Sequence, residues 1–166
     1  MKKIVFITLS LLLALSFWNC EKDDICAEGT PTTPRVIIEF YDAANPTVLK
    51  NVTNLKVVET SLTDGFGFTG VNKIQVPLRT NSEETILNFI QNGNNSDTSD
   101  DNTDELIFNY ATQEVYISRA CGYKMTFQLD AIDGVVATPD GSNWIQNIIV
   151  TQPNIENENE VHVKIY

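Results

Sequence analysis

The most regular pattern in this chain is a strict alternation of apolar and polar side chains close to residue 125. Its members are apolar Tyr123, Met125, Phe127 and Leu129, interleaved with polar Lys124, Thr126 and Gln128. Because successive side chains of a β-strand point to opposite faces, this alternation predicts a strand with one buried face. Other short segments of this kind recur along the chain, separated by turn signals, and no helix is predicted with them. We therefore expect an all-β fold, an antiparallel β-sandwich of Ig-like architecture with about eight or nine short strands, in preference to a barrel.

The strand pattern extends over much of the chain. It occurs in residues 35–41, 55–60, 73–78, 85–90, 106–110, 113–119, 123–129, 144–150 and 161–165. Residues 85–90 also have helical spacing, but residues 106–110 offer a hairpin partner and favour a strand. Pro77 lacks a backbone donor and predicts an edge strand or a strand end at that position.

The N-terminal segment predicts export. Lys2 and Lys3 precede an almost wholly apolar run at residues 4–17. A basic start followed by such a run matches a signal peptide and falls short of the ~20 residues needed to span a bilayer. We expect three parts: a cleaved signal helix at residues 1–19, a lipidated cysteine and polar tether at residues 20–34, and a single β-sandwich domain at residues 35–166.

Two ways of processing the signal segment are open. Residues 14–16, Ala-Leu-Ser, fit the small-x-small pattern of ordinary cleavage, which would release a soluble protein. Alternatively, cleavage falls just before Cys20, whose thiol then carries lipid. The apolar run ending at Cys20 and the polar residues after it resemble a bacterial lipoprotein signal, although Phe17-Trp18-Asn19 departs from its usual residues. We favour lipidation of Cys20, since two or more acyl chains would hold the protein stably on a membrane.

The cysteine count supports lipidation independently. The chain has 3 cysteines, so lipidation of Cys20 leaves Cys26 and Cys121 as a pair in an oxidising compartment. Ordinary cleavage would instead leave one thiol unpaired. We predict a disulfide between Cys26 and Cys121, for which the chain-entropy account gives roughly 4–5 kcal/mol. No Cys/His spacing suggests a zinc site.

The acidity of the chain argues against nucleic acid as a partner. There are 11 basic and 22 acidic residues, a net charge of −11, and loss of the two N-terminal lysines would make it −13. Binding to phosphate backbones needs cationic side chains that displace counterions, and this chain is short of them. A large net negative charge keeps an exported protein soluble, and we favour this explanation of the acidity.

One acidic loop is a weak candidate for calcium. Its oxygen ligands are Asp97, Ser99, Asp101 and Asp104. An EF-hand loop would need glycine and glutamate where this chain has Asn102 and Phe108. We favour a solvated hairpin tip for this loop, and we expect no cofactor and no firm metal site.

Catalytic signatures are scarce. Residues 65–70 read GxGxxG, but the residues after them alternate as a strand, whereas a dinucleotide site needs a helix there. His162 is the only histidine and lies on a terminal strand, which favours a surface residue over a base. Trp144 is a candidate sugar-stacking platform, with core packing as the favoured alternative. Carboxylate pairs for a hydrolase fall in loops and tails, where solvation explains them, so we expect a protein that is not an enzyme.

A set of segments carries a family resemblance. They are Cys20 at the end of the signal, Cys26 with Thr30-Pro31-Thr32-Thr33-Pro34, Phe40-Tyr41-Asp42, Val76-Pro77-Leu78, the predicted hairpin of residues 106–110 and 115–118, and Ala120-Cys121-Gly122-Tyr123. Together they resemble an uncharacterised family of small Bacteroidota (flavobacterial-type) cell-envelope lipoproteins, over most of residues 20–129. The resemblance implies an outer-membrane lipoprotein, and Lys22-Asp23-Asp24 resembles a surface-export signal of that phylum, which favours the cell-surface face over the periplasmic one. The family has no assigned activity, so its resemblance implies a location and not a mechanism.

We expect a lipid-anchored, non-enzymatic module of the outer membrane with a binding or structural role. Its partners would be the membrane, through the anchor, and another envelope protein or a glycan. A carbohydrate- or calcium-binding surface domain is the alternative, and a hydrolase with carboxylate chemistry is third.

Overall fold

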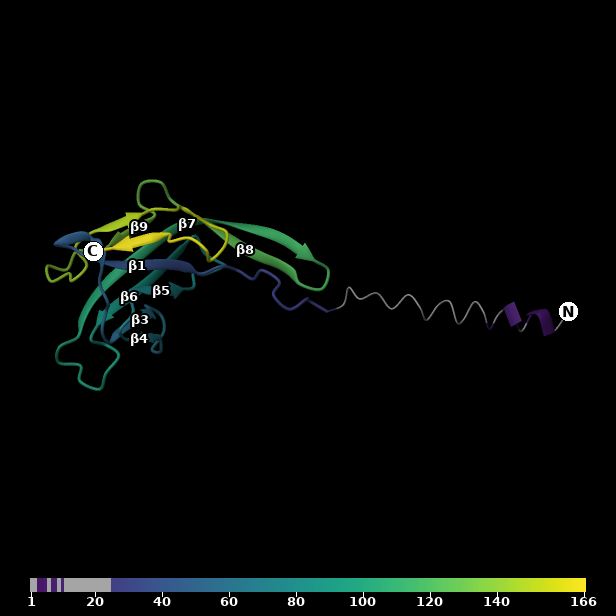
Figure 1. Ribbon diagram of the computed structural model, residues 1–166, viewed down its shortest axis with the longest axis horizontal. Helices are drawn as coiled ribbons and strands as arrows, with labels where there is room; N and C mark the ends of the chain where they lie inside the picture. The colour runs from purple at the N-terminus through teal and green to yellow at the C-terminus, as the bar shows by residue number, and fades with distance from the viewer. Residues whose placement is uncertain (1–2, 6, 9, 11–24) are drawn as a thin grey trace. The chain divides into compact units, whose positions relative to one another are not determined.

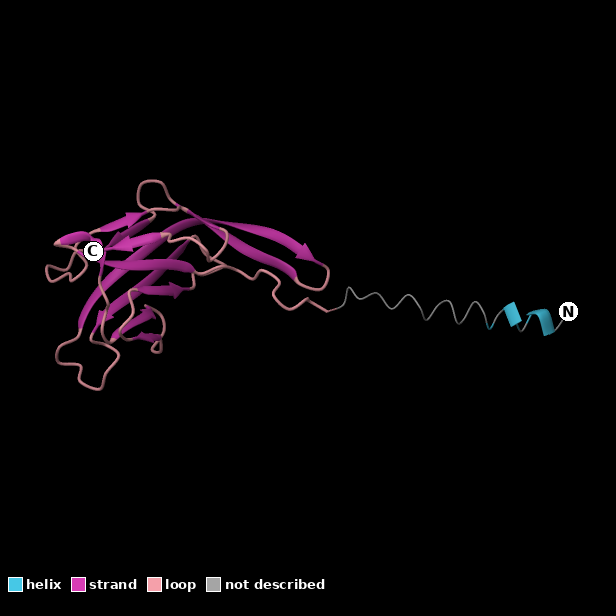
Figure 2. Cartoon of the chain, viewed as in Figure 1, coloured by secondary structure: helices cyan, strands magenta, loops and turns pink. Residues whose placement is uncertain are grey.

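The computed structural model describes residues 3–5, 7, 8, 10 and 25–166. Residues 3–5, 7, 8 and 10 are helical, and Thr8 Oγ1 donates hydrogen bonds of 3.1 and 3.0 Å to the carbonyls of Ile4 and Val5. Strands and loops make up the remainder (Figure 2). Among the described residues, no helix is long and apolar enough to cross a membrane.

The described residues form more strands than the alternation predicts. They are β1 (Val36–Asp42), β2 (Asn45–Leu49), β3 (Leu55–Glu59), β4 (Phe66–Phe68), β5 (Lys73–Val76), β6 (Glu84–Gln91), β7 (Asn102–Ser118), β8 (Gly122–Leu129), β9 (Val135–Ala137), β10 (Ile148–Val150), β11 (Asn154–Ile155) and β12 (Val163–Ile165). Four of the twelve, β2, β4, β9 and β11, lie outside the predicted segments, because two to five residues are too few to show a clear alternation. In contrast, β7 unites two predicted strands in one of 17 residues.

The first sheet has the order β10-β12-β1-β2, and β5 also pairs with β1 (Figure 1). Strands β5 and β1 are antiparallel, with Ile38 opposite Ile74. On its other side β1 runs parallel to β12, with Ile38 opposite Val163. This pair is a parallel exception within the antiparallel sandwich that the sequence predicts. Its two strands are far apart in sequence, and alternation does not give the direction of such a pairing.

The second sheet has the order β11-β8-β7-β6-β3-β4, and β9 also pairs with β7. Strands β6 and β7 form a long antiparallel hairpin, with Leu87 opposite Leu106. Residues 84–91 are therefore a strand and not a helix, which confirms the prediction from their hairpin partner.

The two sheets pack face to face as a β-sandwich around a single apolar core. Alternate residues of the facing strands fill it, among them Ile38 of β1, Phe89 of β6 and Phe108 of β7, none of which is exposed to solvent. Burial of each such side chain is worth about 1.5–3 kcal/mol, so the period-2 pattern of the sequence is also the main source of stability.

The chain divides into two compact units. The first, here called the sandwich, comprises residues 31–115 and 124–166. The second includes residues 25–30 and 116–123, here called the disulfide unit. All the buried apolar side chains of the described residues belong to the sandwich.

Candidate functional site

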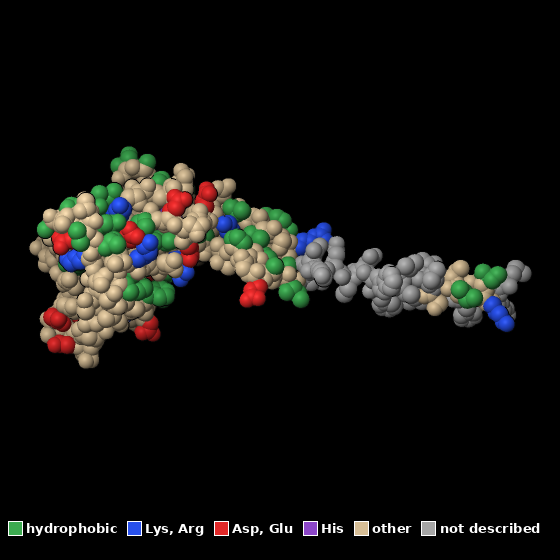
Figure 3. Space-filling view, in the orientation of Figure 1, with side chains coloured by type: hydrophobic (Ala, Val, Ile, Leu, Met, Phe, Trp, Pro, Cys, Tyr) green, Lys and Arg blue, Asp and Glu red, His purple; other side chains and the backbone are tan. Residues whose placement is uncertain are grey.

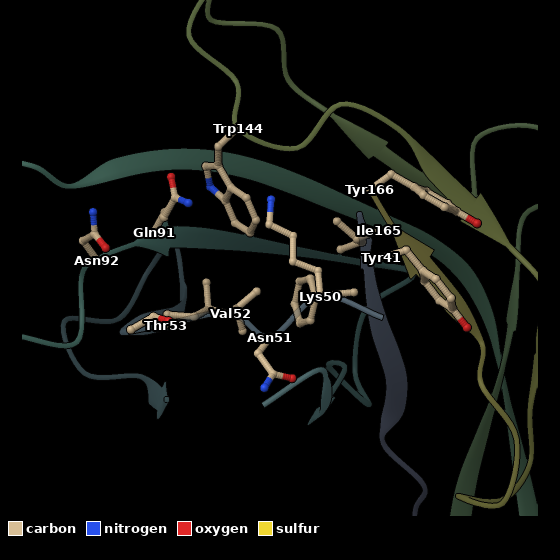
Figure 4. A pocket seen from close by; sticks show the side chains of 12 residues that line it. Tyr41, Lys50, Asn51, Val52, Thr53, Gln91, Asn92, Trp144, Ile165 and Tyr166 are labelled. Carbon is tan, nitrogen blue, oxygen red and sulfur yellow. The ribbon is translucent and has the colours of Figure 1, made fainter. Parts of the chain in front are cut away.

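A pocket of about 240 Å³ opens in the sandwich where β1, β6 and β12 end (Figure 4). It is lined by side chains from both sheets and from three loops: Phe40, Tyr41, Lys50, Asn51, Val52, Thr53, Leu55, Gln91, Asn92, Trp144, Ile165 and Tyr166. Buried Phe40, Leu55 and Ile165 belong to the core, so the floor of the pocket is rigid and apolar. Pockets for drug-sized ligands occupy about 300–1,000 Å³, so this pocket suits one ring of a larger ligand.

Trp144 is held on one side of the pocket by three contacts. Its ring stacks against Phe40 with centroids 6.4 Å apart, and its Nε1 donates a 3.1 Å hydrogen bond to the carbonyl of Phe89. The buried carboxylate of Asp104 accepts the backbone N–H groups of Trp144 at 3.2 Å and Ile145 at 2.8 Å. Because the indole N–H and the backbone are already bonded, Trp144 presents mainly a ring surface to the pocket.

Two tyrosines form the opposite side of the pocket. The parallel pairing places Phe40 opposite Ile165, so that Tyr41 and Tyr166 lie next to each other. Their rings stack with centroids 5.5 Å apart, and Figure 4 shows them side by side. Lys164 Nζ lies 4.8 Å from the ring centroid of Tyr41, which adds a cation–π contact.

The hydroxyl of Tyr41 is fixed from outside the pocket lining. It donates a 2.9 Å hydrogen bond to Glu39 Oε2, and Lys73 Nζ lies 2.8 Å from Glu39 Oε1. Burial raises the pKa of Glu39, but the hydrogen bonds from Lys73 and Tyr41 outweigh it and hold that pKa below its ordinary value. Glu39 therefore stays ionised at neutral pH and keeps the Tyr41 ring oriented.

Hydrogen-bonding groups surround the remainder of the pocket. Lys50 is exposed, and its side chain is drawn beside the Trp144 ring in Figure 4. Gln91 and Asn92 add amide groups, which both donate and accept hydrogen bonds. None of the twelve lining residues is acidic, in a chain with 22 acidic residues. The pocket can thus accept a neutral or anionic ligand with a flat apolar face and a polar edge.

The structure does not gather the four candidate calcium ligands. Asp97 accepts hydrogen bonds from the backbone N–H and hydroxyl of Ser99 in an exposed loop, and Asp101 is also exposed. Asp104 instead lies on β7, with a fully buried carboxylate bonded to the loop that carries Trp144. Among the described residues, no three His, Cys, Asp or Glu side chains are grouped so that they could hold a metal ion.

His162 is buried, so its prediction as a surface residue is wrong. Its ring Nδ1 accepts a 2.9 Å hydrogen bond from the backbone N–H of Ile37. The backbone N–H of His162 donates a hydrogen bond to the carbonyl of Ile37. Burial lowers the pKa of His162, against the opposing charges of Glu160 and Glu158. This histidine is neutral at pH 7 and holds two strands together, away from the lining of the aromatic pocket.

The glycine-rich residues 65–70 contain a short strand. Phe66–Phe68 is β4, which pairs with β3 at the edge of the second sheet. The chain continues into β5 and not into a helix, as predicted, so the segment lacks the helix N-terminus of a phosphate site. Exposed Phe66 and Leu62 border a second, apolar pocket of about 360 Å³.

Cys26 and Cys121 are joined by a disulfide, in agreement with the prediction from the cysteine count. It links residues 95 apart in sequence, and both belong to the disulfide unit. Cys20 and Lys22-Asp23-Asp24 lie outside the described residues.

Most of the pocket residues could not be selected from the sequence. Tyr41, Lys50, Gln91 and Tyr166 come from separate segments that meet only in the folded sandwich. Asp104 did carry a signal, because it continues the inward alternation that Leu106 begins two residues later.

Residues 51–166 match the profile of a family of unknown function, DUF6452, and the chain belongs to this family. The matched residues include most of the pocket lining, whereas β1 and Cys26 precede them. Comparisons with curated proteins and with solved structures found no match.

Proposed function

We propose that this member of the family is a lipid-anchored, non-enzymatic protein of the bacterial outer membrane that binds a saccharide in its aromatic pocket. The observation that carries the binding role is the combination of Trp144, Tyr41 and Tyr166 with amide and lysine side chains around one rigid pocket. A sugar ring has an apolar C–H face and a rim of hydroxyl groups. Aromatic rings cover the first and amide groups bond the second.

The charge of the pocket narrows the class of saccharide. Among the twelve described residues that line the pocket, Lys50 alone has a charged side chain, so the pocket favours neutral or acidic sugars over amino sugars that carry a free ammonium group. The absence of Asp, Glu and His from the lining supports binding over hydrolysis, because glycoside hydrolysis uses a pair of carboxylates at the sugar.

The anchor part of the proposal rests on the sequence. The apolar residues 4–17, Cys20 and the polar residues after it fit a lipoprotein signal, and lipidation leaves an even number of cysteines for the observed disulfide. The Bacteroidota resemblance and Lys22-Asp23-Asp24 favour the outer surface of the outer membrane.

Binding is tested by calorimetric titration of the protein with neutral hexasaccharides and with an oligogalacturonide. Lys50→Ala and Tyr166→Ala remove pocket side chains with little effect on the core, and each should weaken binding about tenfold, which corresponds to ~1.4 kcal/mol. Matched controls are Lys56→Ala and Tyr123→Ala, whose side chains lie outside the pocket lining and should leave the affinity unchanged. No heat from any saccharide, or equal losses in the controls, would refute the saccharide site.

The anchor is tested by feeding the producing bacterium an alkyne-tagged fatty acid. The tag should appear on the wild-type protein and be lost in Cys20→Ala. Tag that persists in Cys20→Ala would place the acyl chains elsewhere and overturn the assignment.

Product analysis of each saccharide after prolonged incubation separates binding from hydrolysis, since released shorter sugars would identify an enzyme.

A further inference from the structure

The disulfide unit exposes an apolar patch of three side chains. Ile25 is 83% exposed, Tyr116 is 56% exposed and Tyr123 is 64% exposed. The rings of Tyr116 and Tyr123 meet edge to face with centroids 5.3 Å apart. In the sandwich most aromatic rings line the pocket or fill the core, with half-exposed Phe66 as an exception, whereas both of these tyrosine rings are exposed.

The patch is also electrically balanced. Residues 25–30 and 116–123 contain one acidic residue, Glu28, and one basic residue, Arg119. The whole chain carries a net charge of −11, so most of its surface is repelled by anionic lipid headgroups. The described residues of the disulfide unit have no such excess, and Figure 3 shows hydrophobic side chains near the point where the continuous described chain begins at residue 25.

The length of the tether determines what the patch can reach. Cys26 follows Cys20 by six positions in the sequence, and a fully extended chain of that length spans at most about 20 Å. The disulfide fixes Cys121 beside Cys26, with their Cα atoms 4.8 Å apart. Cys121 lies between Tyr116 and Tyr123, so an acyl chain on Cys20 would keep both rings within reach of the membrane surface.

We propose that Ile25, Tyr116 and Tyr123 form a membrane-contact surface that lies in the headgroup region of the lipid leaflet. The proposal rests on lipidation of Cys20, which is part of the proposed function. Tyrosine suits this region because its ring enters the apolar boundary while its hydroxyl stays hydrated. The disulfide then has a specific role, since it makes the anchor and the aromatic patch act at one place on the membrane.

The test is hydroxyl-radical footprinting of the full mature protein on vesicles of phosphatidylethanolamine and phosphatidylglycerol. Labelling of Tyr116 and Tyr123 should fall severalfold relative to Cys20→Ala in the same vesicle suspension. Ile132, which is 96% exposed and belongs to the sandwich, is the internal control and should be labelled equally in both proteins. Equal labelling of the two tyrosines in acylated protein and in Cys20→Ala would overturn the proposal.

The same samples separate failure of the patch from failure of the anchor. The mass of the N-terminal peptide reports acylation directly. Acylated protein with unprotected tyrosines refutes the membrane-contact surface and leaves the anchor intact, whereas an unmodified N-terminus refutes both. A second variant, Tyr116→Ser/Tyr123→Ser, should transfer faster between vesicles than wild type, and Ile132→Ser should not; equal rates for the two variants would count against the patch.

Discussion

The sandwich and the disulfide unit are ordered by different means. In the sandwich, side chains such as Phe89 and Phe108 are fully buried between two sheets. The disulfide unit buries no large apolar side chain and is held by a covalent bond, together with hydrogen bonds such as the 2.6 Å bond from Thr30 Oγ1 to the carbonyl of Ala27. The difference shows how a segment can keep a defined shape while its aromatic rings remain available to an external surface. Four predictions test this contrast, beginning with the largest expected effect.

Removal of a core ring should damage the sandwich severely. Phe89→Ala deletes a fully buried ring of β6 and should lower the free energy of unfolding by about 3–5 kcal/mol. The half-exposed Phe66 provides the matched control, since Phe66→Ala leaves no enclosed cavity and should cost far less. Urea denaturation followed by circular dichroism measures both. Equal costs would mean that burial is not what orders the sandwich.

The buried carboxylate of Asp104 should contribute nearly as much as a core ring. Asp104→Ala leaves the N–H groups of Trp144 and Ile145 without their acceptor, at about 1–3 kcal/mol for each unsatisfied group. Trp144 should also lose its fixed position, which near-ultraviolet circular dichroism would report. Asp101→Ala changes an exposed carboxylate and should alter stability by less than about 0.5 kcal/mol. A neutral Asp104→Ala would contradict the positioning role.

Loss of the disulfide should affect the sandwich less than the loop length suggests. Within the sandwich, Thr33 Oγ1 accepts a 3.0 Å hydrogen bond from the N–H of Met125, which is four residues from Cys121 in sequence, and this contact does not need the bridge. In the folded chain the bridge closes a loop of about 12 residues, which runs from Cys26 to Thr33, across the hydrogen bond to Met125 and back to Cys121. In the unfolded chain it closes a loop of 95 residues. Three doublings of loop length at about 0.6 kcal/mol each give roughly 2 kcal/mol, below the 4–5 kcal/mol of the simple chain-entropy account.

The variant Cys26→Ser/Cys121→Ser measures this contribution. Its sandwich should still unfold cooperatively in urea, with the midpoint shifted by the smaller amount. Proteolysis at residues 25–30 should become faster, because the covalent bond that orders this segment is gone. A variant whose sandwich no longer folds would show that the two units depend on the same bond.

Acidification should give the smallest change, and it should act on the sandwich through His162. The folded pKa of His162 is lowered by burial, so the unfolded chain binds its proton first as the pH falls. The stability that the neutral ring provides is present above the ordinary pKa of about 6.5 and is lost as the pH falls toward the lowered folded value. His162→Gln should flatten this part of the stability curve.

The carboxylate of Glu158, whose charge acts on His162, titrates at a lower pH than the histidine. The pKa of Glu158 is lowered by its hydrogen bonds from Arg35, whose Nε and Nη2 lie 2.8 Å from the two carboxylate oxygens. The stability that the ionised Glu158 carboxylate provides is present above its ordinary pKa of 4.5 and is lost as the pH falls below that value. Denaturation midpoints measured from pH 7 to pH 4 therefore separate the two groups. A wild-type curve that is flat between pH 7 and pH 5 would contradict the role of His162.

The sequence predicted the strands where alternation was long and failed where direction depended on a distant partner. Residues 84–91 showed their inner face directly. Residues 123–129 did so only at Phe127 and Leu129, because Tyr123 at the start of the alternation is exposed and polar Thr126 is buried. His162 did not, because its acceptor role depends on Ile37, which is 125 residues away. Asp104 was assigned to the acidic loop because its neighbours are polar, although it belongs to the inward set of β7. The pocket could not be predicted, since its rings are brought together only by the pairing of β1 with β12.

The pairing of β1 with β12 also determines when the first sheet can form during synthesis. On one side, β1 gains its partner strand only when residues 163–165 have been synthesised. Ile37 is therefore made 125 residues before His162, to which it is hydrogen-bonded. At about 5–20 residues per second, the wait is roughly 6–25 seconds. The first sheet therefore closes only after nearly all of the polypeptide has been synthesised.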